Sequence, residues 1–240
     1  GHIYYQRINR LLAELREAEA EVAELSSAPM GELRVAAPLS FGLRRLTPLI
    51  AEFAGRHPQL EVRLDLDDRL VDIVDAGFDL ALRIGYPQDS SLVSRPLAPI
   101  PRCVCASPEY LAARGTPRRP LDLLEHDCLH YRNLSMREEW NLNGPEGMQP
   151  VEVGGRFCSN NGEALCEGAV QGLGIALLPE FLCAQALEQG RLQRVLDAYA
   201  PPPFQLSALY PSRRLVPAKL RALLDFLSAA LTTEGTSRDG

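Results

Sequence analysis

The chain has 240 residues, of which 46% are hydrophobic and 23% are charged, so it can form one large domain or two smaller ones with buried cores. Its 25 Lys and Arg residues against 31 Asp and Glu residues give a formal net charge of −6, and no long basic run is present. Because nucleic-acid binding depends on a basic surface that neutralises phosphates, this composition argues against direct DNA contact by these residues.

The first 28 residues are predicted to form a linker helix that pairs with another helix. Gly1 and His2 resemble the remnant of an expression tag, so the natural protein is expected to begin earlier. A coiled-coil seam is indicated by alternating spacings of four and three, although a single amphipathic helix packed on its own domain remains an alternative. The residues at this spacing are Tyr4, Ile8, Leu11, Leu15, Ala18, Val22 and Leu25.

Residues 32–85 alternate between predicted strands and predicted helices. This order indicates a parallel sheet with right-handed crossovers, in which ligands collect beyond the carboxyl ends of the strands. Ser40, Asp67 and Arg83 follow or end these strands. The predicted strands cover 32–37, 60–67 and 78–85, and the predicted helices cover 38–58 and 68–77.

A second sheet is predicted from residue 101 onwards, because short apolar strands recur between turn residues. The chain then returns with one more strand and a closing amphipathic helix, and its polar end, 233–240, is expected to be disordered. The predicted elements are a strand–helix unit at 101–115, strands at 128–132, 138–143 and 151–159, a helix and strand within 159–179, a helix at 179–188, a strand at 204–211 and a helix at 216–231.

The motifs of common catalytic and cofactor-binding sites are not found. Gly172 and Gly174 resemble part of a dinucleotide fingerprint, but they close a helix and open a strand, which is the reverse of the required order. Gly172 is instead expected to end the helix in a left-handed conformation. No Walker loop, G-x-S-x-G or H-E-x-x-H is present, so we predict no catalytic residue and no cofactor.

The six cysteines sit mostly inside apolar stretches, and no C-x-x-C occurs. We therefore expect no metal site. Cys103 and Cys105 are two apart on a predicted strand and share a face; they are expected to be buried small residues, with a redox-sensing pair as the alternative. Free cysteines, together with the absence of a signal peptide and of any long apolar run, favour the cytoplasm and no membrane segment.

Two predicted helix starts carry polar side chains suited to anions. Asn160 with Glu163 forms a capping-box pattern, and Ser40 is a plausible cap after the first strand. Each can be a satisfied helix end only, or can also present N–H groups to a carboxylate. Arg83 ends an apolar strand, where it can serve a structural ion pair or a ligand carboxylate.

Several segments together resemble the linker helix plus effector-binding domain of LysR-type transcriptional regulators, over nearly the whole chain. They are GELRVAAPLSFG, RLVDIVDAGFDLALRIG, VCASPEYLAARG with HDCLHYR, SNNGEAL followed by GAVQGLGIALLPEF, and ALYPSRRLVPAKLRALLDFL. The resemblance implies an α/β fold with two lobes, similar to periplasmic type II binding proteins, after an N-terminal coiled-coil linker helix at 1–28. Lobe I would cover 30–102 and 206–232, and lobe II would cover 103–205.

The same resemblance implies that a small-molecule effector, which can be an anion, binds in the cleft between the lobes. It also implies a homodimer or homotetramer, and a winged helix-turn-helix before residue 1 that binds DNA. Many relatives carry Thr or Ser at the position of Asp67, and the extra negative charge here would disfavour a small dicarboxylate. The implied effector contacts are Ser40, Phe41, Asp67, Arg83 and Gly85 from lobe I, and Cys158, Ser159, Asn160, Asn161, Leu178 and Pro179 from lobe II.

Two other classes of protein remain as alternatives. A free-standing solute-binding protein of the same fold would need an export signal and would have no use for the heptad helix. An enzyme on a two-lobe scaffold would need a cofactor lysine or an acid–base pair, and Lys219, in the closing helix, is the only lysine of the sequence.

Overall fold

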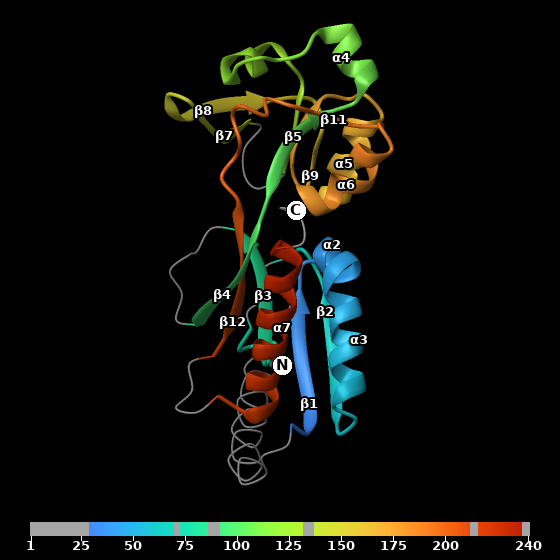
Figure 1. Ribbon diagram of the computed structural model, residues 1–240, viewed down its shortest axis with the longest axis vertical. Helices are drawn as coiled ribbons and strands as arrows, with labels where there is room; N and C mark the ends of the chain where they lie inside the picture. Colours follow the sequence, from blue (N-terminus) through green and yellow to red (C-terminus); the bar gives the residue numbers. More distant parts are fainter. Residues whose placement is uncertain (1–28, 70–72, 86–91, 132–136, 212–215, 237–240) are drawn as a thin grey trace, which may run out of the picture. The chain divides into compact units, whose positions relative to one another are not determined.

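The computed structural model describes residues 29–69, 73–85, 92–131, 137–211 and 216–236. The predicted linker helix at 1–28 and the last four residues lie outside the described residues. The described chain forms two compact units (Figure 1). Unit 1 contains the described residues up to Ala98 and those from Gln205 onwards, and unit 2 runs from Pro99 to Phe204.

Unit 1 is built on a five-stranded sheet with the order β2-β1-β3-β12-β4. As predicted, its first three strands are parallel: Ala37 pairs with Leu66 of β2, and Ala36 pairs with Ala81 of β3. Their carboxyl ends therefore lie at one edge of the sheet, whereas β12 runs antiparallel to β3. The strands are β1 (Gly31–Ala37), β2 (Leu60–Leu66), β3 (Leu80–Gly85), β4 (Val93–Ile100) and β12 (Phe204–Tyr210).

The first helical segment of unit 1 is continuous but changes its hydrogen-bonding pattern. It consists of α2 (Leu39–Phe41), a π-helical stretch η1 (Gly42–Leu46) and α3 (Thr47–Arg56). Both the backbone N–H and the hydroxyl of Thr47 donate to the carbonyl of Gly42. A side chain at Gly42 would collide with Leu66, so a glycine allows this segment to lie close to β2.

Two predictions for unit 1 need correction. The helix expected at 68–77 is a turn over 73–77, which Gly77 closes at φ +70°; residues 70–72 are not described. The closing helix α7 covers Ala218–Thr236, so 233–236 continue the helix rather than form a disordered tail. α7 packs on α3, with the Phe53 and Phe226 ring centroids 5.5 Å apart.

Asp79, at the entry to β3, joins β1 to α7. Its Oδ2 accepts a hydrogen bond from the Arg34 backbone N–H at 2.9 Å and lies 3.2 Å from the Lys219 ammonium nitrogen. Lys219 also donates to the carbonyl of Glu32. This half-buried cation is thus held by partners from β1 and β3, which fixes the start of α7 on the sheet.

Unit 2 contains a second five-stranded sheet with the order β11-β5-β10-β6-β9 and a separate hairpin of β7 and β8. β10 is antiparallel to β5 and parallel to β6. The elements are β5 (Arg102–Ala106), α4 (Pro108–Arg114), the 3-10 helix η2 (Pro120–Glu125), β6 (Cys128–Tyr131), β7 (Arg137–Gly144), β8 (Gly147–Gly154), β9 (Cys158–Ser159), α5 (Gly162–Val170), β10 (Ile175–Pro179), α6 (Glu180–Glu188) and β11 (Gln193–Val195).

The side chains of β5 alternate between two hydrophobic clusters, as expected for a strand buried on both faces. Val104 and Ala106 belong to one cluster, which contains the fully buried Trp140 of the hairpin. Cys103 and Cys105 belong to the other, together with residues of α5 and α6. Among the described residues, no helix has the length and apolar character needed to cross a membrane.

Candidate functional site

Ser40 lies at the carboxyl edge of the unit 1 sheet, in the first turn after β1. The predicted cap is wrong, because the helix begins two residues earlier: Pro38 occupies the N-cap position and contributes no side-chain bond. Ser40 is only 7% exposed, and its hydroxyl has no hydrogen-bond partner among the described residues. A buried hydroxyl without a partner is costly, so this edge of the sheet contains an unused hydrogen-bonding group.

The helix start beside Ser40 already receives a carboxylate. Asp68, directly after β2, accepts a hydrogen bond from the Leu39 backbone N–H through Oδ1 at 3.0 Å. Its neighbour Asp67 donates its backbone N–H to the Ala37 carbonyl at 3.1 Å, and its Oδ1 accepts from the Arg69 N–H at 2.8 Å. The positive end of this helix is thus partly neutralised from within the protein.

Arg83 brings a positive charge to the same edge. It lies near the end of β3, and its Nη1 donates to the Arg69 carbonyl at 3.3 Å. Burial lowers the pKa of the Arg83 guanidinium, while the negative charge of Asp67 acts in the opposite direction. Arg83 and Asp67 therefore interact electrostatically, which supports the structural ion pair that the sequence left open. Arg83 also adds a cation to the site.

Unit 1 gathers all five of its predicted contacts at the ends of β1, β2 and β3. Gly85 is the last residue of β3 and pairs with Gln205 of β12. Phe41 follows Ser40 and is 2% exposed, so its ring packs in the core of the unit. The polar groups at this edge are therefore Ser40, Asp67 and Arg83, with Asp68 as a neighbour that was not among the predicted effector contacts.

In unit 2 the polar head of α5 is capped by Asn161. The predicted capping box of Asn160 with Glu163 is wrong by one residue: the Asn161 Oδ1 accepts from the N–H groups of Glu163 at 2.9 Å and Ala164 at 3.3 Å. Ser159 Oγ in turn accepts from the Asn161 N–H at 3.1 Å, and Asn160 itself is exposed. The helix begins at Gly162, where a Cβ would collide with the Tyr131 hydroxyl and with a methyl group of Leu182.

The remaining predicted contacts of unit 2 differ in accessibility. Cys158 is exposed on β9, where its Cα partner is His130. Leu178 and Pro179, at the end of β10, are buried, and Leu178 is 0% exposed within a hydrophobic cluster. The side chain of Leu178 therefore contributes to the core. Beyond these residues, Gly172 has φ +75° and ends α5, as predicted.

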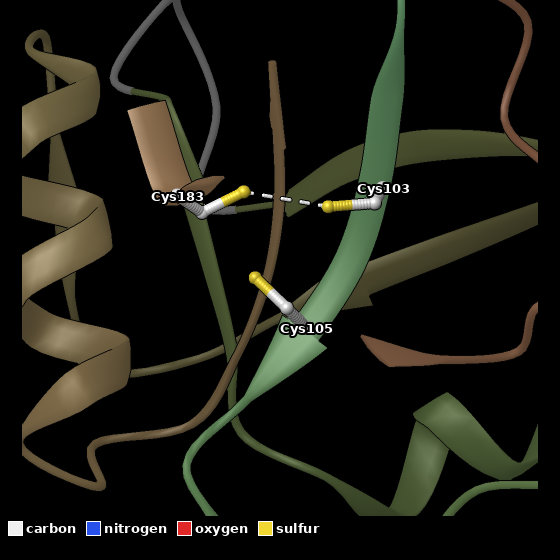
Figure 2. Close-up of side chains that lie close together, drawn as sticks. All are labelled: Cys103, Cys105 and Cys183. Atoms are coloured by element: carbon white, nitrogen blue, oxygen red, sulfur yellow. Dashed lines mark hydrogen bonds between the residues drawn. The ribbon is translucent and has the colours of Figure 1, made fainter. Parts of the chain in front are cut away.

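One side-chain cluster was not found from the sequence. Figure 2 shows Cys183 of α6 beside Cys103 and Cys105 of β5, with the three sulfur atoms pointing toward one another. The three Sγ atoms lie within 4.8 Å of one another, and those of Cys103 and Cys183 are 3.4 Å apart. The period-two pattern did predict that Cys103 and Cys105 share a face. Cys183 comes from an element far along the chain, and no spacing rule connects it to them.

Comparison with known proteins gives consistent results. The family described as LysR substrate binding domain matches residues 26–232. An uncharacterised HTH-type transcriptional regulator of Haemophilus influenzae is 37% identical over 223 residues, which cover 93% of this chain and 77% of the relative. The regulator DmlR of Escherichia coli is 34% identical over 95% of this chain and 74% of its own length.

Solved structures agree with these sequence relatives. CrgA, a LysR-type transcriptional regulator from Neisseria meningitidis, has a TM-score of 0.74 and 32% identity over 96% of this chain and 79% of its own. The full-length virulence activator AphB of Vibrio cholerae has a TM-score of 0.73 and 27% identity over 96% and 78% of the two chains. The predicted α/β fold, with its two sheets, is thereby confirmed.

Proposed function

Because this chain belongs to the family of LysR substrate-binding domains, we propose that its effector binds at the carboxyl edge of the unit 1 sheet, through Ser40 and Arg83. The chain is the effector-binding regulatory region of a LysR-type regulator. The proposal concerns which of its residues bind the effector and what chemistry they select. It identifies unit 1 with lobe I and unit 2 with lobe II of the family's fold.

The observation that carries this proposal is the buried, unpartnered hydroxyl of Ser40. A folded protein normally satisfies such a group, and a ligand that accepts or donates one hydrogen bond would remove the cost of leaving it unpaired. Its position, directly beyond the end of a parallel strand, is also where open α/β sheets usually bind ligands. Ser40 is therefore the expected anchor, and Arg83 adds a charged donor from the neighbouring strand.

The charges at this edge limit the effector. Asp67 and Asp68 carry negative charge, and Arg69 and Arg83 carry positive charge, so the edge has no large excess of either sign. Asp68 already occupies the Leu39 N–H that an anion would otherwise use. We therefore expect an effector with one acceptor group, such as a monocarboxylate or a polar neutral molecule, to bind better than a small dicarboxylate.

The contribution of unit 2 is a second part of the proposal. Ser159, Asn160 and Asn161 form the polar head of α5, and the exposed side chain of Asn160 remains available after Asn161 has been used as the cap. The regulator would form homodimers or homotetramers in the cytoplasm. Effector binding would change how their subunits are arranged, and this change would alter DNA binding by a domain outside this chain. Such coupling requires that the effector bind one arrangement more tightly than another.

A ligand screen with matched variants tests the proposal. Thermal unfolding of the chain is measured against monocarboxylates, dicarboxylates and neutral polar compounds, since a ligand at 100 times its Kd stabilises by about 2.7 kcal/mol. For a stabilising compound, Arg83→Ala should weaken binding by at least about tenfold, the size expected for a lost charged hydrogen bond.

Arg63→Ala is the matched control. Arg63 also lies on the unit 1 sheet, but it is exposed on β2, where it pairs with Glu61 at 3.0 Å and with Glu32 at 3.3 Å. Its loss should leave effector affinity unchanged. Equal affinities of the wild type and Arg83→Ala would contradict the assignment of Arg83.

A further inference from the structure

We propose that Cys103, Cys105 and Cys183 form a three-sulfur site in unit 2 for a trivalent thiophilic ion, arsenic(III) or antimony(III). The three thiols lie on a strand and a helix of unit 2, β5 and α6 (Figure 2). The inference does not depend on the proposed effector site, because it concerns different residues and its test measures ion binding.

The backbone brings the three thiols together. Cys103 and Cys105 share one face of β5, because side chains two apart on a strand point the same way. Across the strand pairing, Cys103 faces Leu178 of β10, whose chain turns directly into α6 and carries Cys183 over that face. The Cys183 Sγ lies 3.6 Å from the Glu180 carbonyl and 3.8 Å from the Pro179 carbonyl, and it points toward Cys103 of β5 (Figure 2).

The sulfur separations suit one shared ion. The three Sγ atoms lie within 4.8 Å of one another, and the closest pair is 3.4 Å apart. Three sulfur ligands at about 2.3 Å from a common centre lie at most about 4.0 Å apart when equally spaced in a plane, and about 3.4 Å apart in a pyramid. Cys103 and Cys183 already have the pyramidal separation, and side-chain rotations that move the Cys105 sulfur by about 1 Å would place all three around one atom.

The number of ligands selects against the commonest sulfur-bound metal. Among the described residues, no fourth Cys, His, Asp or Glu joins the three thiols. Structural zinc requires four ligands, and a water molecule is a poor fourth ligand where Cys103 is 4% exposed and Cys105 and Cys183 are 0% exposed. Three-coordinate sulfur geometry is the normal state of arsenic(III) and antimony(III).

Charge selects the oxidation state. Three thiolates carry three negative charges, so a monovalent or divalent ion would leave net negative charge in the core, whereas a trivalent ion leaves none. Arg194 interacts electrostatically with Cys103 but is paired with Glu180 at 2.8 Å, so it supplies little net compensation. A neutral complex is the one that this apolar cluster can bury at low cost.

The resting thiols are suited to capture such an ion. All three Sγ atoms face one another from β5 and α6, so side-chain rotation alone is needed to bring them around one ion. For As(OH)₃ and three thiols, three As–O bonds break and three As–S bonds form; each thiol proton leaves with a hydroxide as water, and no atom changes oxidation state.

The test is titration of the whole chain with sodium arsenite in a phosphine reductant, followed by intact mass measurement and arsenic X-ray absorption. The expected result is one arsenic per chain, with a mass gain of one arsenic less three hydrogens. The absorption spectrum should show three sulfur neighbours and no oxygen neighbour. Zinc(II) under the same conditions should bind at least about tenfold more weakly.

Matched variants locate the site. Cys105→Ala and Cys183→Ala should each weaken arsenic binding by at least about a hundredfold. Loss of a residue that only hydrogen-bonds to a ligand already costs about 10- to 100-fold in affinity, and loss of the ligand itself costs more. Cys128→Ala, which removes another buried thiol, and Cys158→Ala, which removes the exposed one, should bind as the wild type does.

Each of the following results would overturn the proposal: no adduct in the wild type, an arsenic spectrum with oxygen neighbours, or full binding by folded Cys183→Ala. If either cluster variant fails to fold, as judged by circular dichroism, the wild-type absorption spectrum and the Cys158→Ala titration decide. An adduct that disappears in Cys158→Ala would equally refute the assignment, because it would place the ion at the exposed thiol.

Discussion

Ser40→Ala should make the unliganded protein more stable, although most substitutions in a core destabilise. The Ser40 hydroxyl is buried without a partner among the described residues, and an unsatisfied buried group of this kind costs about 1–3 kcal/mol. Alanine keeps the Cβ, removes only the oxygen and suits a helix better than serine. We therefore expect unit 1 to gain about 1 kcal/mol, or roughly 2–4 °C in melting temperature for a chain of this size.

The assay is urea and thermal unfolding of Ser40→Ala beside Ser107→Ala. Ser107 is also buried, but it is the N-cap of α4, and its Oγ accepts from the Tyr110 N–H at 3.2 Å. Its loss should destabilise by about 1 kcal/mol, so the two serine variants should shift in opposite directions. If Ser40→Ala lowers stability as Ser107→Ala does, the Ser40 hydroxyl has a partner in the protein, and the reasoning that makes it an effector contact fails.

Three further predictions concern unit 2. Gly174→Ala should destabilise the protein by about 3 kcal/mol in urea unfolding, because its Cβ would collide with the backbone just before β6. The control is Gly55→Ala in α3 of unit 1, which has open space around it and should be neutral or slightly stabilising. Equal losses of stability in the two variants would refute the packing argument. Asn161→Ala should cost about 1 kcal/mol while Asn160→Ala costs little, and the reverse order would restore the cap predicted from the sequence. Burial lowers the pKa of the His126 imidazole, so the unfolded chain binds a proton at His126 more readily than the folded chain does. The free energy of unfolding of the wild type, relative to that of His126→Gln, should therefore fall as the pH drops below about 6.5. Parallel pH profiles of the two proteins would contradict this.

The fold could be predicted because its signals are local. Alternating strands and helices over 32–85 implied parallel pairing, and the structure has it between β1, β2 and β3. The left-handed Gly172 was likewise predicted from its place between a helix and a strand. The turn over 73–77 was missed because its apolar spacing also fits a helix, and the end of α7 was missed because polar residues without apolar periodicity can still continue a helix.

The details of the site were harder to predict because they depend on contacts between distant segments. Ser40 follows a strand and resembles a cap, but the carboxylate of Asp68, from the next strand, caps the helix instead. Asn160 has the capping-box spacing, yet the helix begins at Gly162 and Asn161 is its cap. The third thiol of the sulfur cluster lies 80 residues from the first, so only the folded chain brings it there.

Amide hydrogen exchange with and without a stabilising effector tests the central claim most directly. Exchange reports local opening, and a bound ligand slows it at the segments that it contacts. The account predicts slower exchange at the end of β1 and the start of α2, at Asp67–Arg69 and at Arg83–Gly85, with little change near Gly31 and Leu60 at the opposite edge of the same sheet. Slower exchange at the Gly31 edge, with none around Ser40 and Arg83, would contradict it.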